Sequence, residues 1–217
     1  MKKTQKKILN NAILLFNRKG VSNTRLQDIA SNTGISPGNL SYHYKTKKDL
    51  IEAVLELMVV TMMEMSGKNM ALVEKNDYLS IIKNYLRYQI GHRFFYRDIL
   101  EITNLVPEAK TIFKNQMQQV LSFTQNGLYL AIGKGLIKPE PYIGHYEFFA
   151  KNIWAILNSW LVEREVLGIK EVSMQKVIMA IWEFHYPYFT DKGLEIYIEV
   201  KKQLPNMIEE EEKYQVA

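Results

Sequence analysis

The sequence contains no cysteine, which excludes disulfide bridges, zinc ribbons and cysteine nucleophiles. It has four histidines, His43, His92, His145 and His185, and their spacing does not match that of a metal site. No apolar run approaches the roughly 20 residues that a membrane-spanning helix needs. Catalytic triads, nucleophile elbows and phosphate loops have no counterpart in the sequence either. We therefore expect no cofactor, no metal, no membrane partner and no enzymatic activity.

The first residues, with four lysines ahead of an apolar stretch, superficially resemble a secretory signal. Asn10 and Asn11 interrupt that stretch, and no small-residue cleavage site follows it. Four apolar residues instead fall on one face of an amphipathic helix: Ile8, Ala12, Leu15 and Phe16. We expect a soluble, cytoplasmic protein.

Strand patterns are nearly absent, and helical periodicity dominates the chain, which predicts an all-α fold. The expected helices cover residues 3–19, 47–65, 78–94, 107–133, 146–167, 173–189 and 194–208. The polar stretch 66–77 is expected to be a loop, and the tail 209–217 is charged.

Residues 24–50 hold the densest set of local signals. Thr24 and Gln27 fit a capping box, and Gly34 suits the left-handed end of a short helix. Ser36 and Pro37 then suit the start of a second helix. Thr46 and Asp49 repeat the capping pattern at the start of a third. The segment predicts a helix-turn-helix, with a structural helix corner as the alternative.

In the second of these helices Leu40 and Tyr44 are spaced to point inward, which leaves a polar face outward. The chemistry of that face suits a DNA duplex, because Asn39 can pair with adenine and Tyr42 and His43 can meet base edges or phosphate. The predicted DNA-binding residues are Thr24, Arg25, Gln27, Ser36, Pro37, Gly38, Asn39, Ser41, Tyr42, His43, Lys45 and Lys47.

The distribution of charge also indicates that the N-terminal end of the chain binds DNA. The first 50 residues carry 8 Lys and 2 Arg against 2 Asp, whereas the whole chain has a net charge of +5. The remainder is therefore slightly acidic, as expected for a basic DNA-binding module on a neutral body. We expect two domains, a helix-turn-helix domain over residues 1–48 and a helical effector-binding and dimerisation domain over residues 49–217.

The first 60 residues resemble the TetR family of bacterial transcriptional repressors. The resemblance rests on Thr24, Ile29 and Ala30, then on Gly34-Ile35-Ser36, Gly38-Asn39-Leu40, His43-Tyr44, Lys47 and Leu50. The family usually has Tyr directly after the Leu of the recognition helix, where this chain has Ser41. The resemblance implies a homodimer on a palindromic double-stranded operator, released when a small-molecule effector shifts the helix over residues 47–65. It does not identify the effector.

The second half is rich in aromatic residues that suit an effector pocket within a helical bundle. The expected effector-binding residues are Tyr85, Tyr88, His92, Phe95, Phe113, Met117, Trp154 and Asn158, with Phe123 and Trp160 as further members of the cluster. His92, Arg97 and Asn158 stand out because they place polar groups near apolar runs. The alternative for each residue is ordinary core packing. The methionines in and just after the expected helix over residues 47–65 are interpreted as flexible packing residues rather than as metal ligands.

We expect the dimer to form through residues 146–167 and 173–189, whose apolar residues cover more than one helix face. They are Phe148, Phe149, Ile153, Ile156, Leu157, Trp160, Val177, Ile178, Ile181 and Trp182. Burial within a single subunit is the alternative. Two other functions stay open, a non-specific architectural DNA binder and a helical ligand carrier or enzyme with a vestigial DNA module.

Overall fold

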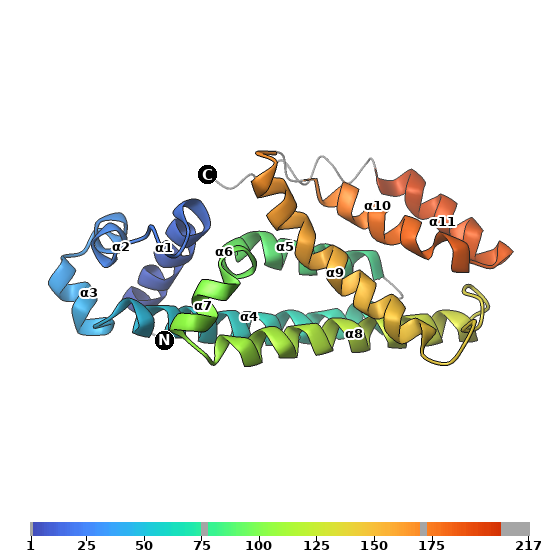
Figure 1. The fold of residues 1–217 in the computed structure, drawn as a ribbon, viewed down its shortest axis with the longest axis horizontal. Coiled ribbons are helices and arrows are strands. Elements are labelled where there is room, and N and C mark those ends of the chain that lie inside the picture. The colour runs from blue at the N-terminus through green and yellow to red at the C-terminus, as the bar shows by residue number, and fades with distance from the viewer. Residues whose placement is uncertain (1, 75–77, 170–172, 205–217) are drawn as a thin grey trace. The chain divides into compact units, whose positions relative to one another are not determined.

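The computed structural model describes residues 2–74, 78–169 and 173–204. Over these ranges turns and loops join helices, and the one β-type pairing is an isolated bridge between Ile137 and Phe189 (Figure 1). The predicted all-α fold is confirmed. The α-helices are α1 (Lys3–Lys19), α2 (Leu26–Thr33), α3 (Pro37–His43), α4 (Lys47–Glu74), α5 (Tyr78–Gly91), α6 (Arg93–Arg97), α7 (Ile99–Leu105), α8 (Ala109–Gly133), α9 (His145–Val166), α10 (Met174–His185) and α11 (Asp191–Gln203). A short 3₁₀ helix, Tyr186–Tyr188, joins the last two.

Two of the expected boundaries are wrong. Helix α4 continues to Glu74, although a loop was expected from Ser66. Ser66, Gly67 and Lys68 are exposed, so their polarity marks the solvent side of a helix that good helix formers continue. The expected helix 78–94 ends at Gly91, and α6 follows as a separate short helix. The tail 209–217 and the expected helical residues beyond 204 lie outside the described residues.

The chain divides into two compact units, Met1–Phe113 and Lys114–Ala217. This division falls within α8, whereas the sequence places the functional boundary near residue 48. In the first unit the apolar stripe of α1 packs against α2 and α4, with Ile8, Ala12 and Phe16 at 0% exposure. The core of this unit therefore joins the helix-turn-helix segment directly to the helix that follows it.

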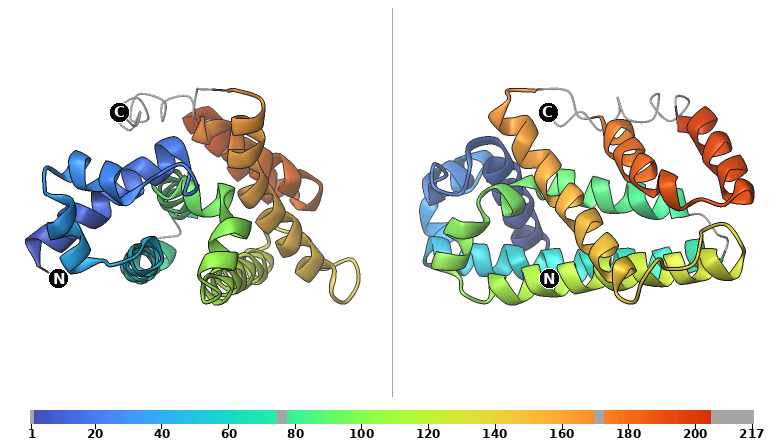
Figure 2. Two further views of the ribbon diagram at one scale, coloured as in Figure 1. Left: turned by 60° about the vertical axis from the view of Figure 1, so that its left-hand side comes forward. Right: turned by 45° about the vertical axis from the view of Figure 1, so that its right-hand side comes forward.

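The second unit has an aromatic core at the junction of α9, α10 and the turn before α11. Figure 2 shows the ribbon of these helices from two further sides. The ring centroids of Phe149 and Tyr188 are 5.3 Å apart, and those of Tyr146 and Tyr188 are 5.9 Å apart. The Tyr146 hydroxyl donates to the carbonyl of Lys138 at 2.7 Å. Burial, followed by the nearby Tyr188 and Glu140, raises the pKa of Tyr146 to about 12. Among the described residues no helix has the length and apolar character that crossing a bilayer requires.

Candidate nucleic-acid interface

Helix α3 begins where the sequence predicts. The Ser36 hydroxyl accepts a hydrogen bond from the backbone N–H of Asn39 at 3.2 Å, and Pro37 occupies the first helical position. Gly34 ends α2 with φ of 73°, a left-handed conformation that glycine adopts without strain. The segment α2–α3 therefore has the sharp turn and the capped second helix of a helix-turn-helix.

The two sides of α3 differ strongly in exposure. Leu40 is 1% exposed and Tyr44 is 8% exposed, so both anchor the helix to the core. The opposite side presents four exposed residues: Gly38, Asn39, Ser41 and Tyr42. Tyr42 is 83% exposed, and its ring meets the half-buried His43 ring edge-on at 5.3 Å. A polar, accessible face on a capped helix is what insertion into a major groove requires.

The predicted capping box at Thr24 is wrong. Arg25 is the N-cap of α2, and its backbone N–H donates to the Asp28 carboxylate at 3.1 Å. Thr24 is 1% exposed, and its hydroxyl donates to the carbonyl of Gly20 at 2.7 Å. Burial of this side chain gives it a structural role in the turn between α1 and α2 rather than the predicted contact with DNA. Arg25 and Gln27 are exposed, as a role in binding requires.

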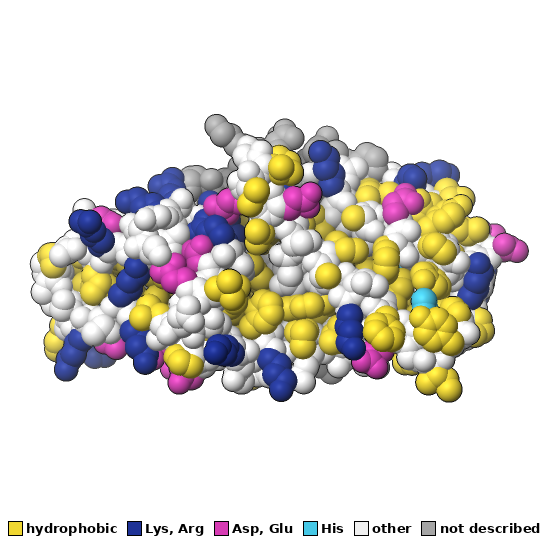
Figure 3. Space-filling view, viewed as in Figure 1, with side chains coloured by type: hydrophobic (Ala, Val, Ile, Leu, Met, Phe, Trp, Pro, Cys, Tyr) yellow, Lys and Arg dark blue, Asp and Glu magenta, His cyan; other side chains and the backbone are white. Residues whose placement is uncertain are grey.

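The basic flank of α3 leads directly into α4. Thr46 and Asp49 form the predicted capping box, with the Asp49 N–H donating to the threonine hydroxyl at 3.1 Å and the Thr46 N–H donating to the carboxylate at 3.0 Å. These hydrogen bonds lower the pKa of Asp49. The Lys47 ammonium donates to the carbonyl of Ser22 at 3.3 Å, while Lys45 is exposed. On the face drawn in Figure 3, dark-blue cationic side chains surround the part of the molecule that carries α1, α2 and α3.

The predicted effector residues fall in both units. In the first unit Tyr85, Tyr88 and Phe95 are buried, whereas His92 and Phe113 are half-buried. The Tyr88 and His92 rings lie 4.5 Å apart, and His92 Nδ1 donates to the Tyr88 carbonyl at 2.9 Å. Burial lowers the pKa of His92, although that hydrogen bond opposes the shift. Burial also raises the pKa of Tyr85. The first unit thus groups neutral polar groups among aromatic rings.

In the second unit Met117, Trp154 and Asn158 are half-buried. Asn158 Nδ2 donates to the carbonyl of Trp154 at 2.7 Å, and its Oδ1 is buried without a hydrogen-bond partner among the described residues. A buried amide oxygen without a partner is the kind of group that a ligand donor satisfies. That these residues bind an effector stays a prediction.

Arg97 was expected near these aromatic residues as a polar group of the effector region. It instead reaches the end of α1, where Nη2 donates to the carbonyl of Phe16 at 2.7 Å. Sequence reasoning also missed Asn17, which is 5% exposed and bonds to α5 and α6. Partners more than 70 positions away in the chain leave no local sequence signal.

Two family models match the chain. A model described as bacterial regulatory proteins, tetR family, matches residues 8–54, and a model described as a bacterial transcriptional repressor matches residues 54–197. Among solved structures, a TetR-family transcriptional regulator from Marinobacter aquaeolei VT8 has a TM-score of 0.77 at 22% identity, covering 94% of this chain and 99% of that one. This structural likeness shows a common fold.

Among curated proteins, the chain is 29% identical over 163 residues to YerO, an uncharacterized HTH-type transcriptional regulator of Bacillus subtilis. That match covers 70% of this chain and 54% of the relative, so the chain spans about half its length. It is 46% identical over 46 residues to IcaR, a negative regulator of the icaADBC biofilm operon in Staphylococcus aureus, covering 21% of this chain and 25% of IcaR. Together the matched family models extend from residue 8 to residue 197, and the chain belongs to the TetR family of bacterial transcriptional regulators.

Proposed function

We propose that this TetR-family regulator is a homodimeric repressor that binds a palindromic DNA operator and dissociates from it when a small-molecule effector binds. The observation that carries the proposal is the exposed polar face of α3 on a helix whose start is capped and whose opposite face is anchored by Leu40. The likeness to a negative regulator over 46 residues supports repression rather than activation.

Within this proposal, Asn39 and Tyr42 read base edges in the major groove, because both side chains are exposed on the same side of α3. Lys45 contacts phosphate and adds affinity without sequence preference. Ser41 is exposed where family members usually carry Tyr, so a hydroxyl on a short side chain replaces a phenol. We infer that the operator preferred by this chain differs from that of relatives with Tyr at this position.

Dimerisation is assigned to α9 together with α10. Seven of the ten apolar residues expected at the interface are buried within the chain itself, so intrachain packing accounts for them: Phe149, Ile153, Leu157, Trp160, Val177, Ile178 and Ile181. A second stripe on α9 is exposed and repeats at the spacing of a helix–helix seam: Phe148, Asn152, Ala155, Ser159, Val162 and Val166. Small and apolar side chains at this spacing suit close packing against the same helix of a second subunit.

Replacing Val162 by Glu tests this interface, because a carboxylate in the seam is desolvated without a partner. We expect a monomer in sedimentation velocity, whereas Glu163→Gln, at the adjacent exposed position off the stripe, stays dimeric. An unchanged dimer in the Val162 variant contradicts the assignment.

The effector is proposed to bind in the region of Tyr85, Tyr88 and His92. Burial favours the neutral forms of Tyr85 and His92, since it raises the pKa of the phenol and lowers that of the imidazole. Because Nδ1 of His92 donates to a carbonyl, neutral imidazole leaves Nε2 as a hydrogen-bond acceptor. The region therefore favours an uncharged, largely apolar molecule with a hydrogen-bond donor.

Selection of binding sites from random duplexes tests operator binding. The expected result is one palindromic sequence, bound about 10³-fold or more above random DNA at physiological salt. Equal affinity for all duplexes favours the architectural alternative. The double variant Asn39→Ala, Tyr42→Ala is expected to lose the selected site, and Ser31→Ala, at an exposed position of α2 outside the predicted DNA-binding residues, is the control. Loss of operator binding in the double variant excludes a vestigial DNA module, whereas retained binding contradicts the assignment of Asn39 and Tyr42 as base-reading residues.

A further inference from the structure

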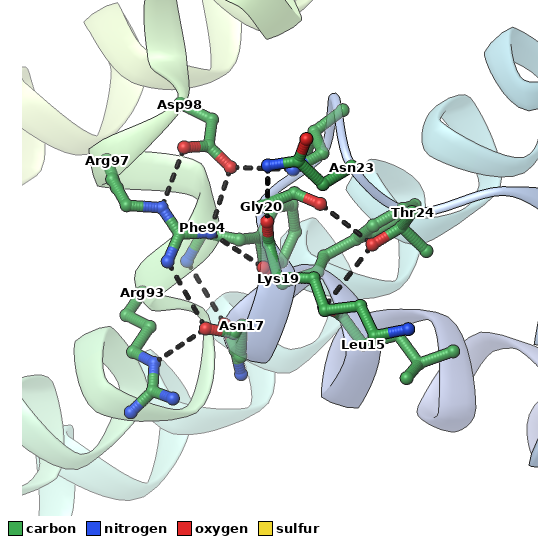
Figure 4. A network of polar contacts seen from close by, with 12 residues as sticks. Leu15, Asn17, Lys19, Gly20, Asn23, Thr24, Arg93, Phe94, Arg97 and Asp98 are labelled. Atoms are coloured by element: carbon green, nitrogen blue, oxygen red, sulfur yellow. Dashed lines mark hydrogen bonds and ion pairs between the residues drawn. The ribbon is translucent and has the colours of Figure 1, made fainter. Parts of the chain in front are cut away.

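The C-terminal end of α1 accepts hydrogen bonds from side chains of a distant helix, in addition to the local bond from the Gly20 N–H to the Phe16 carbonyl at 2.9 Å. An α-helix leaves its last carbonyl groups without intrahelical partners. Here the Phe16 carbonyl accepts from Arg97 Nη2 at 2.7 Å, and the Asn17 carbonyl accepts from Arg97 Nη1 at 3.2 Å and from Arg93 Nε at 3.0 Å (Figure 4). Two arginines at the ends of α6 thus cap the helix that leads into the reading head, defined as α2 and α3.

The hydrogen bonding is reciprocal, because the Asn17 side chain on α1 in turn bonds backbone groups at the end of α5 and in α6. Its Nδ2 donates to the Gly91 carbonyl at the end of α5 at 2.8 Å, and its Oδ1 accepts from the Phe94 N–H in α6 at 3.1 Å. The side chain is 5% exposed, and Phe16 and Phe94 pack beside it with centroids 5.4 Å apart. The donor and the acceptor of one amide are therefore both used, the donor toward α5 and the acceptor toward α6.

Asp98 extends the contact to the turn that follows α1. Its Oδ2 accepts from the Val21 N–H at 2.8 Å, and its two oxygens pair with Arg97 at 2.7 and 3.0 Å. The side chains of the pair are only 17% and 13% exposed. Hydrogen bonds to charged groups with little access to solvent are the stronger ones. Asn17, Arg97 and Asp98 form a connected set that we call the α1–α6 clamp.

We propose that the α1–α6 clamp fixes the orientation of the reading head and thereby sets the half-site spacing that the dimer accepts. The reading head is joined covalently to α1 on one side and to α4 on the other, and of these two helices only α4 continues into the following part of the chain. The clamp is a second attachment at the opposite end of the helix-turn-helix segment. Its residues are positioning residues, because they act through α1 and contact no base. The inference rests on the proposed binding of a dimer to two half-sites.

A polar contact of this kind is better suited to orientation than to stability. Burying charged and amide groups costs desolvation free energy that their hydrogen bonds only offset. Such bonds are directional, however, and three groups that satisfy each other at fixed distances tolerate little rotation of α1. An apolar contact at the same place permits sliding and leaves the orientation less defined.

The test compares operators of altered spacing. The selected operator is compared with copies carrying one or two extra central base pairs, each of which rotates one half-site by about 34°. For the unmodified dimer we expect each insertion to weaken binding about tenfold or more, comparable to a mismatch. Arg97→Lys keeps the positive charge but lacks the several N–H donors of the guanidinium group, and Asp98→Asn keeps an acceptor for the Val21 N–H. In both variants we expect the spacing penalty to fall below about threefold, because lost charge-assisted bonds free the orientation.

Arg18→Ala is the matched control, because Arg18 is an exposed cation in the same turn of α1 with no clamp contact. It is expected to keep the full spacing penalty. Circular dichroism and urea unfolding show whether each variant is folded. If Arg97→Lys does not fold, Asp98→Asn is the variant that tests the clamp.

A folded clamp variant with the unmodified spacing penalty overturns the inference, and so does one that loses affinity for every spacing by the same factor. Absence of any selected operator for the unmodified chain overturns the proposed function instead.

Discussion

Replacing Gly193 by Ala separates helix propensity from packing, because the two predict opposite signs. Gly193 lies in the first turn of α11, and its N–H donates to the Thr190 hydroxyl at 3.1 Å. In a helix interior, Gly→Ala is normally stabilising by about 1 kcal/mol. A Cβ at this position overlaps the Leu136 carbonyl oxygen and lies 2.9 Å from Phe189 Cδ1. The first of these neighbours is backbone, so it cannot move aside as a flexible side chain does.

The clash involves a backbone carbonyl that takes part in the hydrogen bonds at the start of α11. The Leu136 carbonyl accepts from the Thr190 N–H at 3.1 Å, and the Thr190 hydroxyl donates to the Gly135 carbonyl at 2.7 Å. Overpacking costs about 1–3 kcal/mol. Each hydrogen bond that lengthens loses about 1 kcal/mol more. After the propensity gain is subtracted, we expect Gly193→Ala to lower the free energy of unfolding by about 2 kcal/mol.

Urea unfolding followed by tryptophan fluorescence measures this change, because all three tryptophans, Trp154, Trp160 and Trp182, lie in the second compact unit. Gly127→Ala in α8 is the matched control in the same unit, since its added Cβ meets no atom within 4 Å. The control is expected to be stabilising by up to about 1 kcal/mol. If both variants are equally stabilised, the close approach of Leu136 to Gly193 is refuted.

Three further predictions concern the reading head and pH. Ser36→Ala removes the cap of α3 and is expected to lower the free energy of unfolding by about 1 kcal/mol, as measured by urea titration. Lys47→Ala is expected to weaken binding to all duplexes alike and to reduce the salt slope by about 0.9, and a change in base preference contradicts this role. Burial lowers the pKa of His92 and His185, so the unfolded chain binds protons more readily. The free energy of unfolding should therefore fall as the pH drops below about 6.5, by at most about 1.4 kcal/mol per pH unit for each histidine. Urea titrations at pH 7.5 and 5.5 check this, and replacing both histidines (His92→Gln with His185→Gln) should reduce the difference in the free energy of unfolding between the two pH values.

The parts of the site that could be predicted from sequence are those whose partners lie within a few residues. Ser36 meets the N–H of Asn39, and Thr46 meets Asp49, both at a separation of three positions. Gly34 is required by its left-handed backbone alone. In such motifs the residue types and their spacing contain all the information that the geometry needs.

The errors arose where a residue had several possible partners or a distant one. Thr24 stands three residues before Gln27 but bonds backward to Gly20, because the chain turns there and buries its hydroxyl. Arg97 has an aromatic sequence context, yet its partners on α1 lie 80 and 81 positions away. No spacing rule connects residues at that distance, so only the folded chain identifies the α1–α6 clamp.

The unexpected length of α4 has a mechanical consequence. At 28 residues the helix is about 42 Å long, since each residue adds about 1.5 Å along the axis. A rigid rod of that length, pivoting by about 5° at its Glu74 end, carries its Lys47 end through about 3.7 Å. That distance is close to the rise of one base pair along a DNA strand, about 3.4 Å. A shorter rod ending at residue 65 gives only about two thirds of this displacement, so under the proposed effector-driven release the added turns of α4 enlarge the movement of the reading head for a given pivot.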